Sequence, residues 1–305
     1  MLLWNVFVKV LLPILVMFGA GWIMDRRHRL DLATLVKLNI YLLVPAFIFV
    51  HIVESHLTAG AAMKVFAFTI AIIFGMAILS AIIGRAMGYT RPQTRSLQLA
   101  TMFYNSGNYG VPLMALAFPG TGPLLQVFII VATNVSTFTI GLFLASSTHR
   151  SGWRALLPMF RQVSLWAVGA ALVVRLLHLP VQEWRWFWVP LEYFSDALIG
   201  LALVTLGVQI AKTERPQHIS RLGWALGVRL LGGPLLAWAL VGVFGFTGAT
   251  AKIMILSSAF PTAVNTALIA HEFDADPHFA AQAVFSSTLL SMFTVTVLIS
   301  ILQSV

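Results

Sequence analysis

The segment from Asn105 to Pro112 reads Asn-Ser-Gly-Asn-Tyr-Gly-Val-Pro and interrupts an apolar run that extends from Leu97 to Phe118. Such a run is long enough to cross the hydrocarbon core of a membrane as one helix. Two asparagines, two glycines and a proline stand near its middle, and both proline and glycine disfavour a helix interior. We therefore predict a membrane-spanning helix that is broken at mid-membrane depth.

A second apolar run, from Ala249 to Phe273, has a comparable interruption, because residues 257–266 read Ser-Ser-Ala-Phe-Pro-Thr-Ala-Val-Asn-Thr. Backbone groups that leave a helix inside a membrane must be satisfied by protein or by a water-lined cavity. Two breaks that face each other would meet this requirement. Pro112 and Pro261 suit the first turn of the helix that resumes after each break, since a missing amide hydrogen costs nothing there.

The direction of the two broken helices predicts the ligand that they attract. After each break the resumed helix begins near the midplane, and its free amides carry about half a positive charge. Two such ends at one place favour an anionic group such as a carboxylate, while the carbonyl ends of the preceding helices could hold a cation. We predict a substrate-binding centre formed by Asn105, Asn108, Gly110, Pro112, Pro261, Thr262, Asn265 and Thr266.

The composition indicates an integral membrane protein. Of 305 residues, 59 % are hydrophobic and only 10 % are charged, whereas about 25 % are charged in ordinary globular proteins. The formal net charge is +9, but the basic residues stand singly or in small groups between apolar runs, so we expect no nucleic-acid partner. The chain has no cysteine, which excludes disulfides, zinc-thiolate sites and thiol nucleophiles. We expect no metal site and no cofactor.

Apolar windows of the length needed to cross a bilayer predict an all-α fold with ten membrane spans. Ten spans divide into two halves of five, and an odd number per half inverts the second half, as in many secondary transporters. The predicted halves are residues 1–147 and 156–305, joined by a central cytoplasmic loop at 148–155. The predicted spans are Trp4–Met24, Leu32–Val53, Met63–Met87, Leu97–Phe118, Gly122–Ala145, Leu156–Leu177, Trp188–Ala211, Leu222–Phe246, Ala249–Phe273 and Phe279–Leu302.

The basic residues indicate the orientation in the membrane. They concentrate in alternate loops of the ten-span arrangement, for example around Arg26, Arg91, Arg150 and Lys212. Under the positive-inside rule these loops are cytoplasmic, and the remaining loops lie outside. We therefore expect a multi-pass protein with both termini on the outer side of the membrane.

These motifs resemble those of the auxin efflux carrier family, which includes bacterial members and the plant PIN carriers. The similarity rests on the Asn-x-Gly-x-x-Gly-x-Pro pattern that begins at Asn105, on Leu38-Asn39 followed by Pro45, and on the break at Pro261. It extends over essentially the whole chain. The short central loop is similar to the bacterial branch, which implies a bacterial inner membrane and periplasmic termini.

The resemblance implies a fold of two inverted five-helix repeats with crossed, broken fourth and ninth helices. Spans one, two, six and seven would form a scaffold, and spans three to five and eight to ten a transport domain with an elevator-type motion. It also implies transport of small organic anions, such as carboxylates or auxin-like acids, and a homodimer. Family roles carry over only to Asn105, Gly110, Pro112, Pro261 and Asn265.

Three further polar residues lie within predicted spans. We interpret Asn39 as a scaffold contact. Two interpretations stay open for Asp196, a carboxyl group that couples transport to protons or an outer-interface carboxylate close to Glu192. Arg229 could reach the inner surface or a substrate carboxylate, and we favour the surface.

The sequence thus predicts a secondary carrier of small organic anions that works by alternating access in the lipid bilayer. The coupling ion, H⁺ or Na⁺, is left open. One alternative is a sodium-coupled organic acid symporter of the bile-acid-symporter type, and another is a membrane sensor that binds its ligand without moving it. We do not expect an enzyme, because no serine has a histidine base nearby within its own predicted span.

Overall fold

The computed structural model describes residues 4, 6–146, 162–212, 219–273 and 275–304. These residues form helices, and no strand longer than a single bridge occurs among them. The predicted central loop at 148–155 and the beginning of the predicted span from Leu156 lie outside the described residues. The prediction of an all-α fold is confirmed for the part of the chain that the structure describes.

Seven continuous helical runs within the described residues are long and apolar enough to cross a membrane. Several of them contain a short π-helical segment, labelled η. The seven runs are η1 (Phe7–Leu11) with α2 (Leu12–His28); α3 (Leu32–Leu38) with η2 (Asn39–Leu43) and α4 (Val44–Glu54); α5 (Ala59–Ala86); α8 (Thr121–Ser136) with η3 (Thr137–Gly141) and α9 (Leu142–Ser146); α12 (Arg185–Lys212); α13 (Ile219–Gly227) with η5 (Val228–Gly232) and α14 (Gly233–Val241); and α17 (Pro277–Ser304). The chain is therefore a multi-pass membrane protein.

The remaining helices are shorter. α11 (Val163–Leu176) is apolar, but its described length is below that of a typical span. α6 (Arg91–Met102) and α7 (Gly110–Ala117) are separated by a non-helical segment, as are α15 (Gly248–Ser258) and α16 (Val264–Glu272). The helix breaks predicted from the prolines, glycines and asparagines are therefore present in both places.

One group of helices packs around α12. α12 lies against α2 and α4, and α11 lies against α4. Glycines allow the closest of these contacts, since a side chain on Gly21 of α2 would overlap the Val204 backbone, and one on Gly207 of α12 would overlap the Phe18 backbone. An ion pair between Lys212 and Asp25, at 3.0 Å, joins the same two helices.

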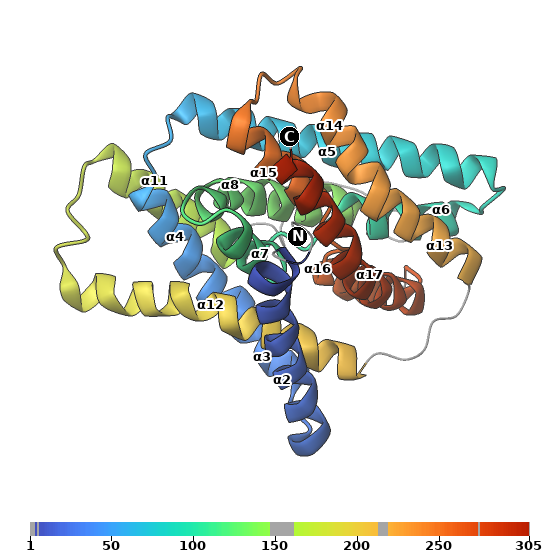
Figure 1. Cartoon of the computed structure of the whole chain (residues 1–305), viewed down its shortest axis with the longest axis horizontal. Helices are drawn as coiled ribbons and strands as arrows, with labels where there is room; N and C mark the ends of the chain where they lie inside the picture. Colours follow the sequence, from blue (N-terminus) through green and yellow to red (C-terminus); the bar gives the residue numbers. More distant parts are fainter. Residues whose placement is uncertain (1–3, 5, 147–161, 213–218, 274, 305) are drawn as a thin grey trace.

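The other helices form a second group around α5. α5 packs on α6, α8 and α14, α14 packs on α15, and α17 packs on α13 and α16. Figure 1 shows α7, α8, α15 and α16 near the centre of the molecule, with α5 and α14 along one side and α2, α3 and α12 along the opposite side. The two interrupted helix pairs thus lie in the middle of the fold, where α8 of the second group meets α4 of the first.

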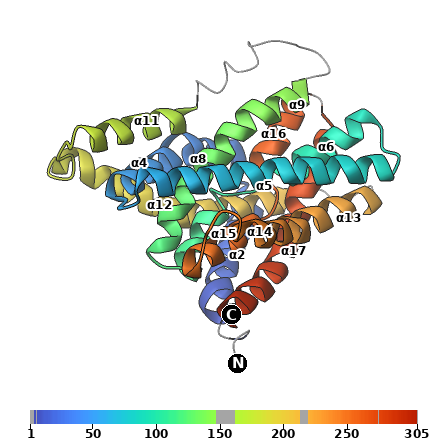
Figure 2. The same cartoon turned by 90° about the horizontal axis from the view of Figure 1, so that it is seen from above.

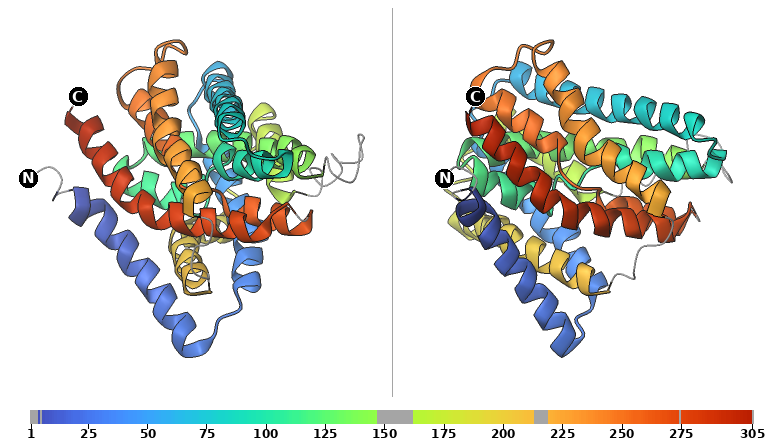
Figure 3. Two further views of the ribbon diagram at one scale, coloured as in Figure 1. Left: turned by 90° about the vertical axis from the view of Figure 1, so that its right-hand side faces the viewer. Right: turned by 45° about the vertical axis from the view of Figure 1, so that its right-hand side comes forward.

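Two of the long helices, α5 and α12, share a common direction. Figures 1 and 2 agree that α5 and α12 run the same way along the long axis, on opposite sides of the molecule. Figure 3 shows the beginning of the first helical run and the end of α17 on the same side. Helices as long as α5 and α12, with 28 residues each, are long enough to cross a bilayer.

Candidate functional site

The first break begins where α6 ends at Met102 and finishes where α7 begins at Gly110. Its turns are closed by the backbone, since the Gly110 amide donates to the Asn105 carbonyl at 2.9 Å. Pro112 lies in the first turn of α7, as predicted. Gly110 is required by packing, because a Cβ there would lie 2.6 Å from both the Gln126 amide nitrogen and the Phe260 ring.

The second break lies between Ser258, where α15 ends, and Val264, where α16 begins. The prediction that Pro261 lies in the first turn of the resumed helix is wrong, since Pro261 precedes α16 by three positions in the chain. Its carbonyl instead accepts a hydrogen bond from the Asn105 amide at 2.8 Å. Proline suits this position because the segment is extended and requires only a carbonyl acceptor from it.

The two breaks are joined by an antiparallel bridge between Tyr104 and Thr262. The Ala263 amide donates to the Phe103 carbonyl at 3.0 Å on one side of this bridge. The Thr262 hydroxyl donates to the Ala100 carbonyl at 2.7 Å, and its amide donates to the Ser287 hydroxyl of α17 at 3.0 Å. Backbone groups released by the two breaks are thus satisfied by protein at the crossing.

Thr262 does not cap α16. The residue that precedes that helix is Ala263, which makes no side-chain capping bond. Thr262 is fully buried, and its hydroxyl is used within the crossing, where it satisfies a carbonyl close to the end of α6. Thr266, also buried, donates its hydroxyl to the Ala263 carbonyl at 2.6 Å. Both threonines therefore stabilise the shape of the break.

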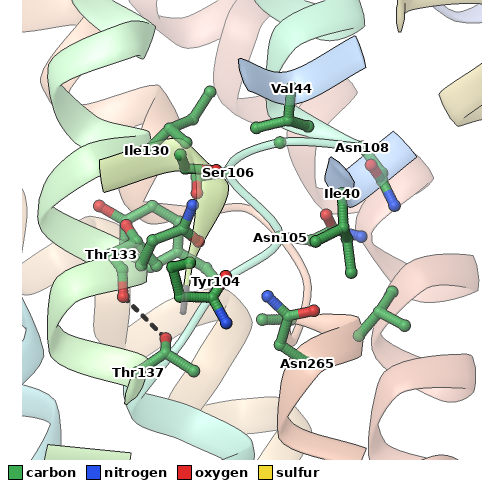
Figure 4. A pocket seen from close by; sticks show the side chains of 16 residues that line it. Ile40, Val44, Tyr104, Asn105, Ser106, Asn108, Ile130, Thr133, Thr137 and Asn265 are labelled. Carbon is green, nitrogen blue, oxygen red and sulfur yellow. Dashed lines mark hydrogen bonds between the residues drawn. The ribbon is translucent and has the colours of Figure 1, made fainter. Parts of the chain in front are cut away.

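A cavity of about 50 Å³ lies beside the crossing and holds room for a few water-sized groups. Of the predicted substrate-binding residues, Asn105, Asn108 and Asn265 line this cavity, whereas Gly110, Pro112, Pro261, Thr262 and Thr266 lie outside its lining. Figure 4 shows the three asparagine side chains on one side of the cavity and Thr133 and Thr137 on the other, with Tyr104 nearby.

The side-chain amide nitrogen of Asn105, unlike its backbone amide, is free to donate hydrogen bonds. The residue is only 6 % exposed, and its Nδ2 atom has no hydrogen-bond partner among the described residues. A buried amide donor without a partner is costly, so such a group is typical of a place where a ligand or water binds. The helices that begin beside it, α7 and α16, add the positive ends of two helix dipoles.

The opposite wall of the cavity comes from helices that the sequence did not single out. Thr133 and Thr137 donate their hydroxyls to backbone carbonyls of the α8–η3 run at 2.7 Å, so each oxygen can act toward the cavity only as an acceptor. The Thr133 side chain also hydrogen-bonds with that of Tyr104. Asn134 lines the same wall. The signal in the sequence was a polar face on an apolar helix, since residues four apart lie on one side.

The first group of helices contributes another part of the cavity wall. Ile40 and Val44 reach it from the α3–α4 run, and Gln162 and Ser164 reach it from the start of α11. No charged side chain lies among the described residues that line it. The cavity is therefore lined mainly by neutral amides and hydroxyls, and it lies between the two groups of helices.

Gln126 of α8 holds the first break in place from behind. Its side chain is fully buried, and its Nε2 atom donates to the Ser106 carbonyl at 2.7 Å. Because Ser106 stands between the two cavity asparagines of this segment, the bond fixes the loop that carries both of them. Gln126 was not predicted, since an isolated glutamine in an apolar helix gives no directional signal.

Arg229 is where sequence and structure disagree most. The interpretation that it reaches the inner surface is wrong, because its side chain is fully buried. Its guanidinium donates to the Thr101 carbonyl at the end of α6 and to the Ser258 carbonyl at the end of α15. The guanidinium carbon lies 5.1 Å from the centre of the Tyr104 ring. The carbonyl ends for which the sequence analysis considered a cation are thus bonded to the Arg229 guanidinium.

The two other predicted polar residues lie away from the cavity lining. Asn39 is fully buried and donates its Nδ2 hydrogen to the Thr205 hydroxyl at 3.0 Å, which joins the α3–α4 run to α12. Asp196 is exposed on α12 and interacts electrostatically with His51 and Glu54 at the end of α4. Both interpretations of Asp196, as a proton-coupling carboxyl group and as an outer-interface carboxylate, therefore stay open.

Comparisons with known proteins agree with this architecture. A family model described as membrane transport protein matches residues 147–299, half of the chain. A protein of Methanothermobacter thermautotrophicus, described as an uncharacterized transporter, is 26 % identical over 289 residues, which cover 93 % of this chain and 94 % of that protein. With a multi-pass helical fold and two broken helices that meet at a polar cavity, the chain belongs to the membrane transport protein family of the auxin efflux carriers.

Proposed function

We propose that this protein is a secondary carrier of small organic anions and that the cavity beside the crossing is its substrate site. The observation that carries the proposal is the unpartnered side-chain amide nitrogen of Asn105. This residue lines a cavity beside the starts of α7 and α16. Amide donors and helix N-termini are the groups that bind carboxylates without a charged side chain. Asn265 and Asn108 complete the proposed donor set.

The substrate that suits this lining is small and carries groups of two kinds. The asparagine side-chain amides and the start of α16 offer donors to a carboxylate, whereas the first-turn amides of α7 are already bonded within the break. The Thr137 oxygen offers an acceptor to a hydroxyl or to a second, protonated group. Short hydroxy acids and dicarboxylic acids have both.

The proposed mechanism is alternating access by an elevator-type motion. Its support is that the cavity has one wall from the α3–α4 run and α11 and the other wall from the crossing and α8. The first set, with α2 and α12, would be the scaffold. The second, with α5, α13, α14 and α17, would be the transport domain that moves the site between the two faces of the membrane.

We further propose ten spans in two inverted repeats. Counting each interrupted helix pair once and α11 once raises the seven long runs to ten. An even number agrees with the first run beginning on the side where α17 ends (Figure 3). The proposed halves are residues 1–147 and 156–305. We also propose that the protein lies in a bacterial inner membrane with periplasmic termini. From the resemblance to the family, we propose that it forms a homodimer.

The proposal has two rivals. A sodium-coupled organic acid symporter would use the same crossing but would need Na⁺ for transport. A sensor would bind the anion in the same cavity without moving it. The relative described as a transporter favours a carrier over a sensor, and an enzymatic function finds no support in the amides and hydroxyls of the cavity.

The test is flux in proteoliposomes. Malate, malonate, lactate and indole-3-acetate would be supplied in turn while the Na⁺ and H⁺ gradients are varied separately. The carrier proposal predicts saturable uptake of at least one small carboxylate that is lost in Asn105→Ala. Binding of one of these anions without flux under any gradient would support the sensor, and an absolute requirement for Na⁺ would support the symporter.

A further inference from the structure

Arg229 is the one arginine of η5, and its place in the fold calls for an explanation. A charged side chain inside a membrane protein costs at least a few kcal/mol unless it is compensated. Ion pairs among the described residues join Lys212 to Asp25 and Arg221 to Asp276, and no carboxylate pairs with Arg229. Its Nε atom has no hydrogen-bond partner in the same part of the chain. The charge is thus retained without a neutralising anion.

The partners of Arg229 are the carbonyl ends of the two interrupted helices. Thr101 lies one residue before the end of α6, and Ser258 is the last residue of α15. The C-terminal end of a helix carries about half a negative charge, so two such ends at one place attract a cation. In broken-helix transporters, carbonyls of this kind coordinate the coupling ion. Here the guanidinium occupies them.

The chain is built to admit this side chain. Gly233 is four residues beyond Arg229, and a Cβ at that position would overlap both the guanidinium and the Ser258 carbonyl. Because residues four apart share a helix face, only glycine leaves room for the guanidinium to reach the carbonyl. Arg229 and Gly233 therefore act as one structural unit.

The charge of Arg229 lies close to the proposed anion site. Tyr104 lines the cavity, and the guanidinium carbon of Arg229 is 5.1 Å from the centre of its ring. A positive charge inside a protein is less screened than in water, so one held against a residue that lines the cavity favours an anion there. The cavity lining itself contains no charged side chain, and Arg229 brings a full positive charge to the carbonyls of the crossing.

We propose that Arg229 is a built-in cation that fills the carbonyl site of the crossing in place of a dissociable ion and prepares the cavity for an anion. The part of this inference that concerns the anion rests on the proposed function as an anion carrier. It assigns Arg229 a positioning role, in which it holds both helix ends together and supplies the charge that a bound Na⁺ would otherwise supply. Anion binding then requires no Na⁺.

The experiment compares Arg229→Ala and Arg229→Lys with a matched control, Arg175→Ala. Arg175 also donates to two backbone carbonyls, those of Ile52 and Leu57, but lies outside the crossing. For each purified variant, Tm is measured in sodium chloride, choline chloride and millimolar guanidinium chloride. The dissociation constant of the transported anion found in the flux screen is measured in the same solutions.

The proposal predicts that wild-type Tm and anion affinity are the same in sodium and choline. Arg229→Ala should lower the affinity roughly tenfold or more, and added guanidinium should raise both its Tm and its affinity. Arg229→Lys should keep more of the affinity than Arg229→Ala, and Arg175→Ala should keep all of it without responding to guanidinium.

Three results would overturn the proposal: Na⁺-dependent binding by the wild type, unchanged affinity in Arg229→Ala, or no effect of guanidinium on that variant. If Arg229→Ala does not fold, Arg229→Lys decides the matter, since a folded lysine variant whose anion affinity falls tenfold would contradict a role for the charge. The Tm response to guanidinium needs no anion, so it tests the cation site even where no anion binds to the wild type and the carrier proposal fails.

Discussion

Asn105 contributes to the protein in a different way from Thr262 on the other side of the crossing. The Asn105 Nδ2 atom has no protein partner, whereas the Thr262 hydroxyl is bonded to the Ala100 carbonyl. A side chain that makes no bond in the folded state contributes little to stability and is available to a ligand. We therefore expect substitution of Asn105 to affect mainly anion binding, and substitution of Thr262 to affect mainly stability.

Asn105→Ala should weaken anion binding without unfolding the protein. A hydrogen bond to a charged group contributes about 1.5–3 kcal/mol, so the dissociation constant should rise roughly tenfold or more. Binding would be measured on the purified protein together with Tm. Asn39→Ala is the comparison, because it loses the Thr205 bond away from the cavity lining and should lower Tm while anion affinity is kept. Wild-type affinity in Asn105→Ala would remove this residue from the site.

Thr262→Val should have the reverse effect. The substitution keeps the shape of the side chain but leaves the Ala100 carbonyl without its donor, which costs about 1–3 kcal/mol for a buried group. Thermal unfolding of the purified variant should show a lower Tm, and the remaining folded protein should bind the anion with nearly normal affinity. An affinity loss as large as that of Asn105→Ala at unchanged Tm would contradict this assignment.

At the scale of elements, the contact between α2 and α12 depends on two glycines. Gly21→Ala and Gly207→Ala would each place a Cβ against the backbone of the opposite helix. Such overpacking destabilises by about 1–3 kcal/mol, which a shift of Tm would reveal. Gly19→Ala and Gly200→Ala are controls on the same two helices, since a Cβ at either meets nothing within 4 Å. Equal effects at all four positions would mean that helix propensity, not packing, is being measured.

The sequence predicted the elements of the crossing better than its contacts. Residues 105–112 and 257–266 carry prolines, glycines and asparagines that disfavour a helix in any surroundings, so both breaks could be located. The place of Pro261 could not, because a proline fits an extended segment as well as a first turn. Arg229 was misplaced because a long side chain on a helix can extend toward the surface or the interior, and only the position of its neighbours decides.

The polar wall on α8 was missed for a related reason. Serine and threonine in membrane helices commonly donate to the carbonyl four residues earlier, as Thr133 and Thr137 do. Such bonds satisfy the hydroxyl locally, so the residue type gives no sign of a ligand. Their spacing of four marks a polar face, but only the packing of α8 beside the first break shows that this face lines a cavity.

At the scale of the whole molecule, transport requires the two groups of helices to move relative to each other. The chain has no cysteine, so introduced cysteines are its only thiols. A cross-link between α4 and α8, at Ile48 and Val127 of one shared apolar cluster, should stop flux. A cross-link within the proposed scaffold, at Asp25 and Lys212, should leave flux intact. Flux that continues with α4 fixed to α8 would contradict an elevator-type motion.

The most direct test of the central claim is a structure of the protein determined with a transported anion bound. We expect the anion to lie in the cavity beside the crossing, with its carboxylate within hydrogen-bonding distance of the Asn105 Nδ2 atom and close to the first turns of α7 and α16. An anion bound elsewhere in the molecule, while this cavity contains only water, would contradict the account.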